Sequence, residues 1–333
     1  ETISEENYFF KLSKYSDNIK ELIKKDKLKI IPEKAKNDFL SLIHNGLTDV
    51  SFSRDKKHLP WGVPVPGDEN QVIYVWGDAL VNYLTGVGYP DKKYKKYWPA
   101  DLHVVGKDML RFHTGIWPGM LLSAGITLPK KVIVHGFLTV NEQKMSKSLG
   151  NVVSPLILRE KYESDTIRYF LMRSIPFGED GDFDEKALVD RNNNELANKL
   201  GNLISRVSTL AEKYGIEKSN KLELPGKDVL SNVKKHLENY ELHKSLETIF
   251  TYIDKTNEYI QNSKPWETQD KKVLYELVLA IKNIAILLNP FIPDTSEKIA
   301  KTFNFKISLD EIDKPLNVKE KIEKSEILFK KIT

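Results

Sequence analysis

The chain has 333 residues, enough for two domains, and its 40% hydrophobic and 29% charged residues are typical of globular proteins. Its 51 basic and 47 acidic residues leave a net charge of +4, which neither requires nor excludes a nucleic-acid partner. The absence of cysteine excludes disulfides and thiolate metal ligands, and the seven histidines show no metal-binding spacing, so we expect no metal site within this chain.

No segment predicts a membrane span or a secretory signal. The most hydrophobic window, 273–293, is interrupted by Glu276, Lys282 and Asn283 and therefore predicts a core helix of a bundle. We expect a cytoplasmic protein without a membrane partner.

The first half of the chain predicts strands alternating with helices. Residues 1–46 predict two helices, the second opened by Pro32 and ended by Gly46, and a proline-rich connection follows at 60–68. Further along, we expect strands at 71–76, 101–105 and 132–135 and helices at 78–84 and 107–124. Apolar strands alternating with helices predict an α/β fold with a parallel sheet, and such folds bind nucleotides where a helix follows a strand.

From about residue 154 the pattern becomes helical. We expect helices at 155–161, 165–173, 184–214, 229–262, 271–288 and 293–303. Helices without intervening strands predict an all-α helix bundle. The change of pattern places the domain boundary between about 150 and 190.

The most informative motif is the polar loop Lys144-Met145-Ser146-Lys147-Ser148, which follows the apolar strand at 132–135. Lysine grips phosphate oxygens as a point charge, and two lysines on one loop can follow a polyphosphate as negative charge builds up. A bare Lys-x-x-Lys pair is more often a solvated loop, but this full pentad after a strand favours phosphate chemistry.

Two further motifs lie at expected strand ends. Trp76, Ala79 and Tyr83 share one helical face and could form a narrow slot for a thioether, or simply an aromatic core stripe. Gly106 allows close backbone approach to a ligand, and Asp108 could accept ribose hydroxyls or merely favour a helix start.

The helical half carries a candidate base-reading set. Asn202 and Arg206 are four residues apart on one helix, so they share a face. Pro265 and Trp266 end another helix and predict either an exposed stacking platform or a capping tryptophan in the core.

The pentad resembles the second signature of class I aminoacyl-tRNA synthetases, and its surroundings look most like the methionyl-tRNA synthetase family. This resemblance implies catalytic roles for Lys144 and Lys147. It implies ATP-binding roles for Arg54, Gly106, Asp108, His135, Leu138, Lys144, Met145, Ser146, Lys147 and Ser148. It implies a methionine pocket of Trp76, Ala79, Tyr83, Met109 and His113, and anticodon contacts from Asn202, Arg206, Pro265 and Trp266. For Arg54, a surface salt bridge remains an alternative.

The resemblance also implies the architecture and the reaction. We expect the second half of a Rossmann-type catalytic domain at 1–153, a connecting stem-contact region at 154–190 and an anticodon-binding bundle at 191–333, whose tail (326–332) would be a terminal strand. The implied activity joins L-methionine to tRNA(Met) through methionyl-adenylate, with ATP and Mg²⁺. The alternatives are a catalytically silent tRNA-binding subunit and a synthetase for another apolar amino acid, against which Trp76, Tyr83 and His113 speak.

Several family features are missing from the sequence. The first ATP signature, His-Ile-Gly-His, does not occur, and neither does the cysteine-bearing insertion that could hold zinc. The aspartate expected to hold the methionine amino group is also missing. We therefore expect a C-terminal portion of the enzyme, whose other half was removed or is supplied by a second chain.

Overall fold

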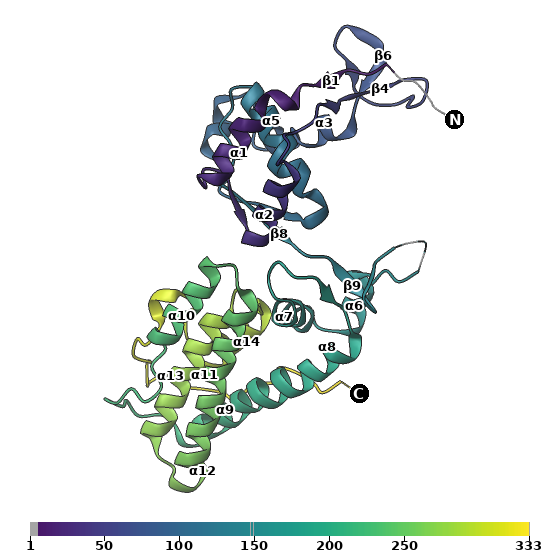
Figure 1. The fold of residues 1–333 in the computed structure, drawn as a ribbon. Helices are drawn as coiled ribbons and strands as arrows, with labels where there is room; N and C mark the ends of the chain where they lie inside the picture. Colours follow the sequence, from purple (N-terminus) through teal and green to yellow (C-terminus); the bar gives the residue numbers. More distant parts are fainter. Residues whose placement is uncertain (1–5, 147, 149, 333) are drawn as a thin grey trace. The chain divides into compact units, whose positions relative to one another are not determined.

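The computed structural model describes residues 6–146, 148 and 150–332, and the chain divides into two compact units between residues 137 and 138 (Figure 1). The first unit mixes strands and helices, whereas the second is largely helical. The expected catalytic segment 1–153 extends past this division, because the hairpin that leads into the pentad belongs to the second unit.

A three-stranded parallel sheet forms the centre of the first unit. In spatial order its strands are β2 (Lys29–Ile31), β8 (Lys131–His135) and β7 (His103–Gly106). The expected strands at 101–105 and 132–135 are thus confirmed. Strand β2 was missed, because three residues between two helices are too short to show a strand periodicity.

Helices cover this sheet with apolar side chains. They are α1 (Ser16–Lys24), α2 (Glu33–Leu42) and α5 (Trp117–Ser123). Ile19, Phe39 and Trp117 from these helices share one buried cluster with Val132 and Val134 of β8. Burying a side chain of this size contributes about 1.5–3 kcal/mol, so this cluster fixes the strands against the helices.

The expected strand at 71–76 does not join the parallel sheet. It forms β6 in an antiparallel sheet ordered β4 (Ser53–Asp55), β6 (Asp68–Ile73), β5 (Pro64–Val65). Gly67 between β5 and β6 has a φ of 85°, which lets the chain reverse and pair with itself. Apolar alternation within one strand does not specify the direction of its partner, and the prediction was wrong for this reason.

Shorter elements complete the first unit. They are β1 (Phe9–Phe10), which pairs with β3 (Val50–Ser51), the 3₁₀-helices η1 (Leu12–Tyr15), η2 (Lys92–Lys96) and η3 (Lys107–Met109), the helices α3 (Val75–Ala79) and α4 (Asn82–Thr85), and the π-helix η4 (Phe112–Ile116). The single helix expected at 107–124 is therefore three successive helical segments of different winding.

The second unit begins with a small sheet. The hairpin of β9 (Leu138–Val140) and β10 (Gln143–Lys144) turns at Asn141 and Glu142, which both have positive φ, and β11 (Gly181–Asp182) lies parallel to β9. No strand was expected between residue 154 and the tail. β11 was missed because its two residues carry no periodic signal.

The rest of the second unit is a helix bundle, as expected (Figure 1). Its helices are α6 (Pro155–Lys161), α7 (Ser164–Ser174), α8 (Glu185–Arg191), the π-helix η5 (Asn192–Gly201), α9 (Asn202–Tyr214), α10 (Lys227–Glu238), α11 (Leu242–Ser263), α12 (Pro265–Thr268), α13 (Lys271–Leu288), α14 (Pro293–Phe303) and the 3₁₀-helix η6 (Leu309–Glu311). α8, η5 and α9 follow one another without a break and form the long rod of the figure. The helix expected at 229–262 is interrupted at Tyr240, whose φ of 62° ends helical winding.

Helix α13 forms the centre of the bundle and is buried on all sides from Leu274 to Leu288. Three polar side chains on it hold the surrounding loops. The Lys282 ammonium donates to the Lys314 carbonyl at 2.7 Å, Glu276 accepts from the Glu223 amide, and Asn283 donates to Asp313 at 2.7 Å. Among the described helices, none is long and apolar enough to cross a membrane.

The tail is not a strand, contrary to expectation. The side chain of Asn192 donates to the Lys330 carbonyl at 3.0 Å, and the side chain of Asn193 both donates to and accepts from the backbone of Ile332. The Ser208 hydroxyl accepts from the Ser325 amide. The tail thus takes its hydrogen bonds from helix side chains, which short-range patterns do not reveal.

We predict that Asp313→Ala destabilises the second unit. The Asp313 carboxylate accepts from the amides of Gly226 and Lys227, at 2.8 and 2.9 Å, and from buried Asn283. Leaving such donors unsatisfied costs about 1–3 kcal/mol. Urea unfolding should show this loss, while the exposed Asp310→Ala, the matched control, should change little. Equal effects of both variants would contradict the role of Asp313.

Candidate functional site

An aromatic cluster in the first unit gathers several of the residues expected to hold an apolar side chain. Tyr83 from α4 donates its hydroxyl to Nε2 of His113, on the π-helix η4, at 2.9 Å. Trp76 from α3 stacks on Phe112, the neighbour of His113, with 4.2 Å between ring centroids. Half-buried Ala79 lies three residues after Trp76 on the same face of α3.

The hydrogen bonds of His113 define its tautomer. Nδ1 lies 3.1 Å from the Met109 carbonyl, which can only accept, so Nδ1 carries the proton and Nε2 accepts from Tyr83. Burial lowers the pKa of His113 and raises the pKa of Tyr83. The His113 ring and the Tyr83 hydroxyl are therefore both uncharged at neutral pH.

Sequence reasoning missed His103, whose ring belongs to this aromatic cluster. Its ring lies 4.5 Å from that of Tyr83 and 5.9 Å from that of His113. It is 5% exposed, and burial, followed by the neighbouring His113, lowers its pKa to about 4. No local feature of the sequence distinguishes His103 from the other histidines, because its burial results from the fold.

The carboxyl ends of β7 and β8 gather three of the expected nucleotide-binding residues. The strand register pairs Gly106 with His135. A Cβ added to Gly106 would lie 2.9 Å from Oδ1 of Asp108 and 3.7 Å from the His135 ring, so a side chain at this position would displace the Asp108 carboxylate. Ligands of α/β sheets bind outside the carboxyl ends of strands, and this edge is therefore the candidate nucleotide site.

The structure places Arg54 in the antiparallel sheet. Its guanidinium lies 4.2 Å from the centroid of the Tyr74 ring and donates to Ser51 Oγ and the Ser53 carbonyl at 2.8 and 2.7 Å. These contacts orient Arg54 through a cation–π stack and neutral acceptors, rather than through the salt bridge considered above.

The second unit carries the pentad and Leu138. Lys144 ends β10, and Met145, Ser146 and Ser148 follow it, whereas Lys147 lies outside the described residues. Leu138 begins β9 and packs against the small cluster formed by Leu158, Ile167, Phe170, Phe183 and Leu188.

Two residues that sequence reasoning missed hold the pentad in place. Asn151 accepts from the Ser146 amide at 2.8 Å and donates to the Lys144 carbonyl at 3.3 Å. Asp182 accepts from the Thr139 hydroxyl at 2.7 Å and the Glu142 amide at 2.9 Å, and these bonds, the hydroxyl first, lower its pKa. Asn151 lies three residues after the pentad and directly after Gly150. This closeness in the sequence is the signal that could have identified it.

Two of the expected base-reading residues, Arg206 of α9 and Trp266 of α12, lie against each other. The Arg206 guanidinium lies 5.2 Å from the centroid of the Trp266 ring and donates to Gln261 at 3.3 Å. Asn202 is exposed one turn earlier. Pro265 is buried, so it is not part of an exposed platform as expected, and Trp266 packs partly against the core. Trp266 is therefore partly a core residue and partly exposed, between the stacking platform and the core tryptophan that the sequence allowed.

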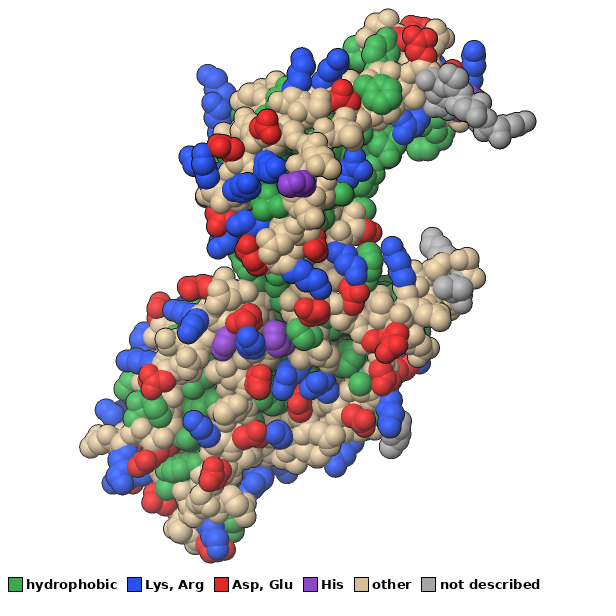
Figure 2. All heavy atoms as spheres, in the orientation of Figure 1, with side chains coloured by type: hydrophobic (Ala, Val, Ile, Leu, Met, Phe, Trp, Pro, Cys, Tyr) green, Lys and Arg blue, Asp and Glu red, His purple; other side chains and the backbone are tan. Residues whose placement is uncertain are grey.

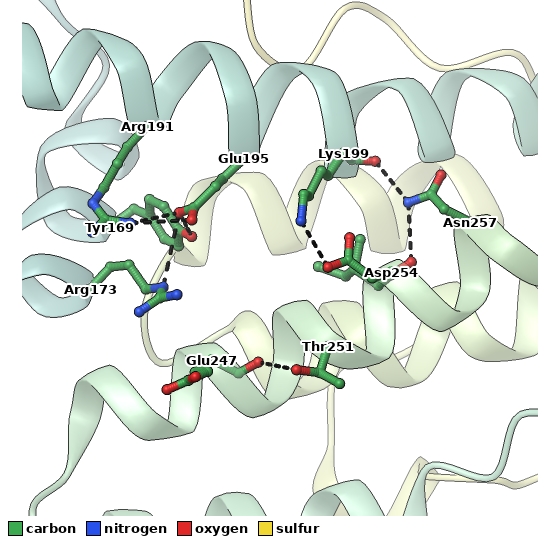
Figure 3. A network of polar contacts seen from close by, with 10 residues as sticks. Tyr169, Arg173, Arg191, Glu195, Lys199, Glu247, Thr251, Asp254 and Asn257 are labelled. Atoms are coloured by element: carbon green, nitrogen blue, oxygen red, sulfur yellow. Dashed lines mark hydrogen bonds and ion pairs between the residues drawn. The ribbon is translucent and has the colours of Figure 1, made fainter.

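An ionic network fixes the long rod between these two sites (Figure 3). Glu195 accepts from the Tyr169 hydroxyl and forms ion pairs with Arg191, at 3.2 Å, and Arg173, at 3.9 Å. One turn further along, Lys199 pairs with Asp254 of α11 at 2.8 Å. Among the described residues, no group of three or more His, Asp or Glu side chains could hold a metal ion.

Comparison with known proteins identifies the family of this chain. The family model for tRNA synthetases class I (M) matches residues 1–208, and the model for the anticodon-binding domain of tRNA ligase matches residues 227–332. The methionine–tRNA ligase of Clostridium perfringens is 40% identical over the whole chain, which covers 55% of that relative. That of Caldanaerobacter subterraneus is 42% identical over 90% of this chain and 50% of its own length.

A solved structure gives the same picture. Methionyl-tRNA synthetase of Mycobacterium tuberculosis bound by methionyl-adenylate superimposes with a TM-score of 0.91 at 35% identity, covering 98% of this chain and 69% of that one. The chain spans about half the length of the curated relatives it matches. Because the first family model matches more than half of its residues, the chain belongs to the class I tRNA synthetases (M).

Proposed function

We propose that this chain forms part of a methionine–tRNA ligase, which activates L-methionine with ATP and transfers it to tRNA(Met) for protein synthesis in the cytoplasm. The observation that carries the proposal is the neutral Tyr83–His113 pair beside stacked aromatic rings, in the unit where Gly106, Asp108 and His135 meet. The names of the relatives, and the methionyl-adenylate in a structure similar to this one, support it.

The proposed reaction has two steps and no covalent intermediate on the enzyme. A methionine carboxylate oxygen attacks the α-phosphorus of ATP, the bond to the β-phosphate oxygen breaks, and pyrophosphate leaves; Mg²⁺ bound to ATP would neutralise part of its charge. A terminal hydroxyl of the tRNA then attacks the carbonyl of the adenylate and AMP leaves. The protein's contribution is positioning and charge stabilisation.

We assign ATP contacts within each unit separately. In the first unit, Gly106 lets the nucleotide approach the β7 backbone closely, Asp108 accepts ribose hydroxyls, His135 lines the adenine and Arg54 contacts the phosphates. In the second unit, Leu138 contacts the adenine, and the pentad residues Lys144, Met145, Ser146, Lys147 and Ser148 contact the phosphates, where the two lysines neutralise the charge that builds on the pyrophosphate. Asn151 positions this loop through its bonds to Ser146 and Lys144.

We assign the methionine side chain to the slot of Trp76, Ala79, Tyr83, Met109 and His113. Because Tyr83 occupies Nε2 of His113, the pair offers a thioether an uncharged wall rather than a competing polar group. Sulfur in contact with aromatic rings contributes about 0.3–1.5 kcal/mol per contact. A hydrophobic slot of this kind distinguishes methionine from shorter side chains by shape.

We assign anticodon recognition to Asn202, Arg206 and Trp266, with Pro265 as a buried support. Trp266 offers a ring for base stacking, and Arg206 and Asn202 offer donors to base edges from the next helix. The segments 1–153, 154–190 and 191–333 would then serve as catalytic, connecting and anticodon-binding regions. Binding of tRNA(Met) without adenylate formation would favour the alternative of a silent tRNA-binding subunit.

We predict that Lys147→Ala in the full-length enzyme lowers methionine-dependent pyrophosphate exchange by about 10²-fold, the usual effect of losing one electrostatic donor to a transition state. Methionine affinity should barely change. Lys186→Ala, which removes an exposed lysine of the same unit, is the control and should keep the parent rate. A normal exchange rate for Lys147→Ala would refute the assignment.

We predict that Tyr83→Phe raises the KM for methionine about 5- to 10-fold at pH 7.5, because unpaired Nε2 of His113 would then face the thioether at a cost of about 1 kcal/mol or more. The kcat of exchange should change less than the KM. In the parent, lowering the pH until His113 protonates should weaken methionine binding, since a charged ring cannot accept from Tyr83. A methionine KM independent of both changes would contradict the pocket.

We predict that Trp266→Ala weakens binding of tRNA carrying CAU by about 5- to 150-fold, the value of one stacked base. Arg206→Lys, which keeps the charge but loses the planar fork, should lower discrimination between CAU and a mutated anticodon. Pyrophosphate exchange without tRNA is the internal control and should persist in both variants. Unchanged discrimination would assign Trp266 to the core alone.

A further inference from the structure

The positive charge of the chain is concentrated where the strands of the parallel sheet begin. Segments 24–29, 91–101 and 130–131 contain ten lysines and three aspartates, a net charge of +7, whereas the whole chain carries +4. The remaining residues are therefore net negative. These three segments precede β2, β7 and β8 respectively.

The parallel register brings the three segments to one edge of the sheet. Lys29 is paired with Lys131 across β2 and β8, and the Lys130 amide donates to the Ala100 carbonyl at 2.9 Å. Neighbouring strands lie about 4.8 Å apart, so β2 and β7 begin about 10 Å from each other. In Figure 2, Lys and Arg side chains are frequent on the flank of the first unit that carries α1, the helix that ends in the first of these segments.

The segment before β7, 91–101, is anchored by aromatic side chains. Trp98 is buried and its indole donates to the Thr127 carbonyl at 2.8 Å, while Tyr94 packs edge-on against Tyr89 with 5.2 Å between centroids. The 3₁₀-helix η2 between these anchors carries four lysines in its five residues. Among the described residues, none of these four ammonium groups has an acidic partner within ion-pair distance.

We propose that this amino-edge surface, formed by Lys27, Lys29, Lys92, Lys93, Lys95, Lys96 and Tyr97, binds the phosphate backbone of single-stranded RNA. Lysines bind phosphate oxygens as point charges, and Tyr97, which is 62% exposed, offers a ring on which a base can stack. An acidic protein would be bound by the lysine charges alone, whereas a nucleic acid can also stack a base on an aromatic ring. The presence of Tyr97 among the lysines therefore favours a nucleic acid.

The amino-edge surface is separate from the site described above. Gly106 and His135 end β7 and β8 at the opposite edge, about 13 Å away for the four residues of β7. The proposed RNA contact therefore neither uses nor blocks the candidate ATP and methionine residues. The proposed RNA contact is therefore independent of whether this protein attaches methionine to tRNA.

The test measures binding of a 12-nucleotide oligouridylate to the full-length protein over a range of salt concentrations. All variants carry Asn202→Ala, Arg206→Ala and Trp266→Ala, which remove the base contacts proposed for the second unit. Changing Lys92, Lys93, Lys95 and Lys96 to Ala should weaken binding at least 10-fold at low salt. It should also reduce the slope of log K against log salt by about 2–3, since each phosphate contact contributes about 0.7.

The matched control changes four exposed lysines of the second unit, Lys218, Lys234, Lys235 and Lys319, to Ala and removes the same charge. It should change affinity less than 2-fold. Tyr97→Leu should weaken binding about 5-fold or more without changing the salt slope. Equal losses of RNA affinity in the two quadruple variants would show that the amino-edge surface is an ordinary solvated charged surface. Displacement of RNA by poly-glutamate together with no effect of Tyr97→Leu would show an acidic protein partner; either result overturns the proposal.

Discussion

Parallel pairing of β2, β8 and β7 is the constraint on which the first unit depends. In a parallel sheet all strands begin at one edge and end at the other, so residues that are far apart in the sequence are sorted by their position along a strand. Gly106 and His135 meet at one edge for this reason, and the lysines before each strand meet at the other. Buried Val132 and Val134 on β8, packed with helix side chains, hold the sheet in this register.

The second unit depends instead on polar side chains that hold backbone. Asn151 and Asp182 hold the pentad and its hairpin, Asp313 holds the start of α10, and Asn193 holds the tail. Each of these carboxylates and amides replaces a hydrogen bond that a strand or helix would otherwise supply. Short segments without regular structure are therefore well defined beside the helices.

The helices of the second half could be predicted from the sequence, because they depend on local spacing. The helices at 155–161, 271–288 and 293–303 begin and end where proline and apolar periodicity place them. The apolar residues of β8 likewise predicted a buried strand. Tyr83 and His113 form a hydrogen bond although they lie 30 residues apart in the sequence. Only the family resemblance suggested from the sequence that these two residues belong together.

What could not be predicted depends on tertiary contacts or on very short elements. Strands β2 and β11 have three and two residues, too few for any periodic pattern. The direction of pairing of β6, the burial of His103 and Pro265, and the docking of the tail all depend on partners distant in the sequence. A single-sequence pattern contains no information about these partners.

The π-helix η5 determines the direction in which Asn202 and Arg206, the proposed base contacts, project from the rod. It occupies ten residues between α8 and α9, and Asn202 is the first residue after it. An α-helical residue advances the helix by about 100°, while a π-turn takes up more residues per revolution. Deleting one residue within η5 would therefore rotate Asn202 and Arg206 away from α12 while leaving the rod intact. In this chain, the length of one helical segment would therefore set the direction of the proposed base contacts, whichever residues make them.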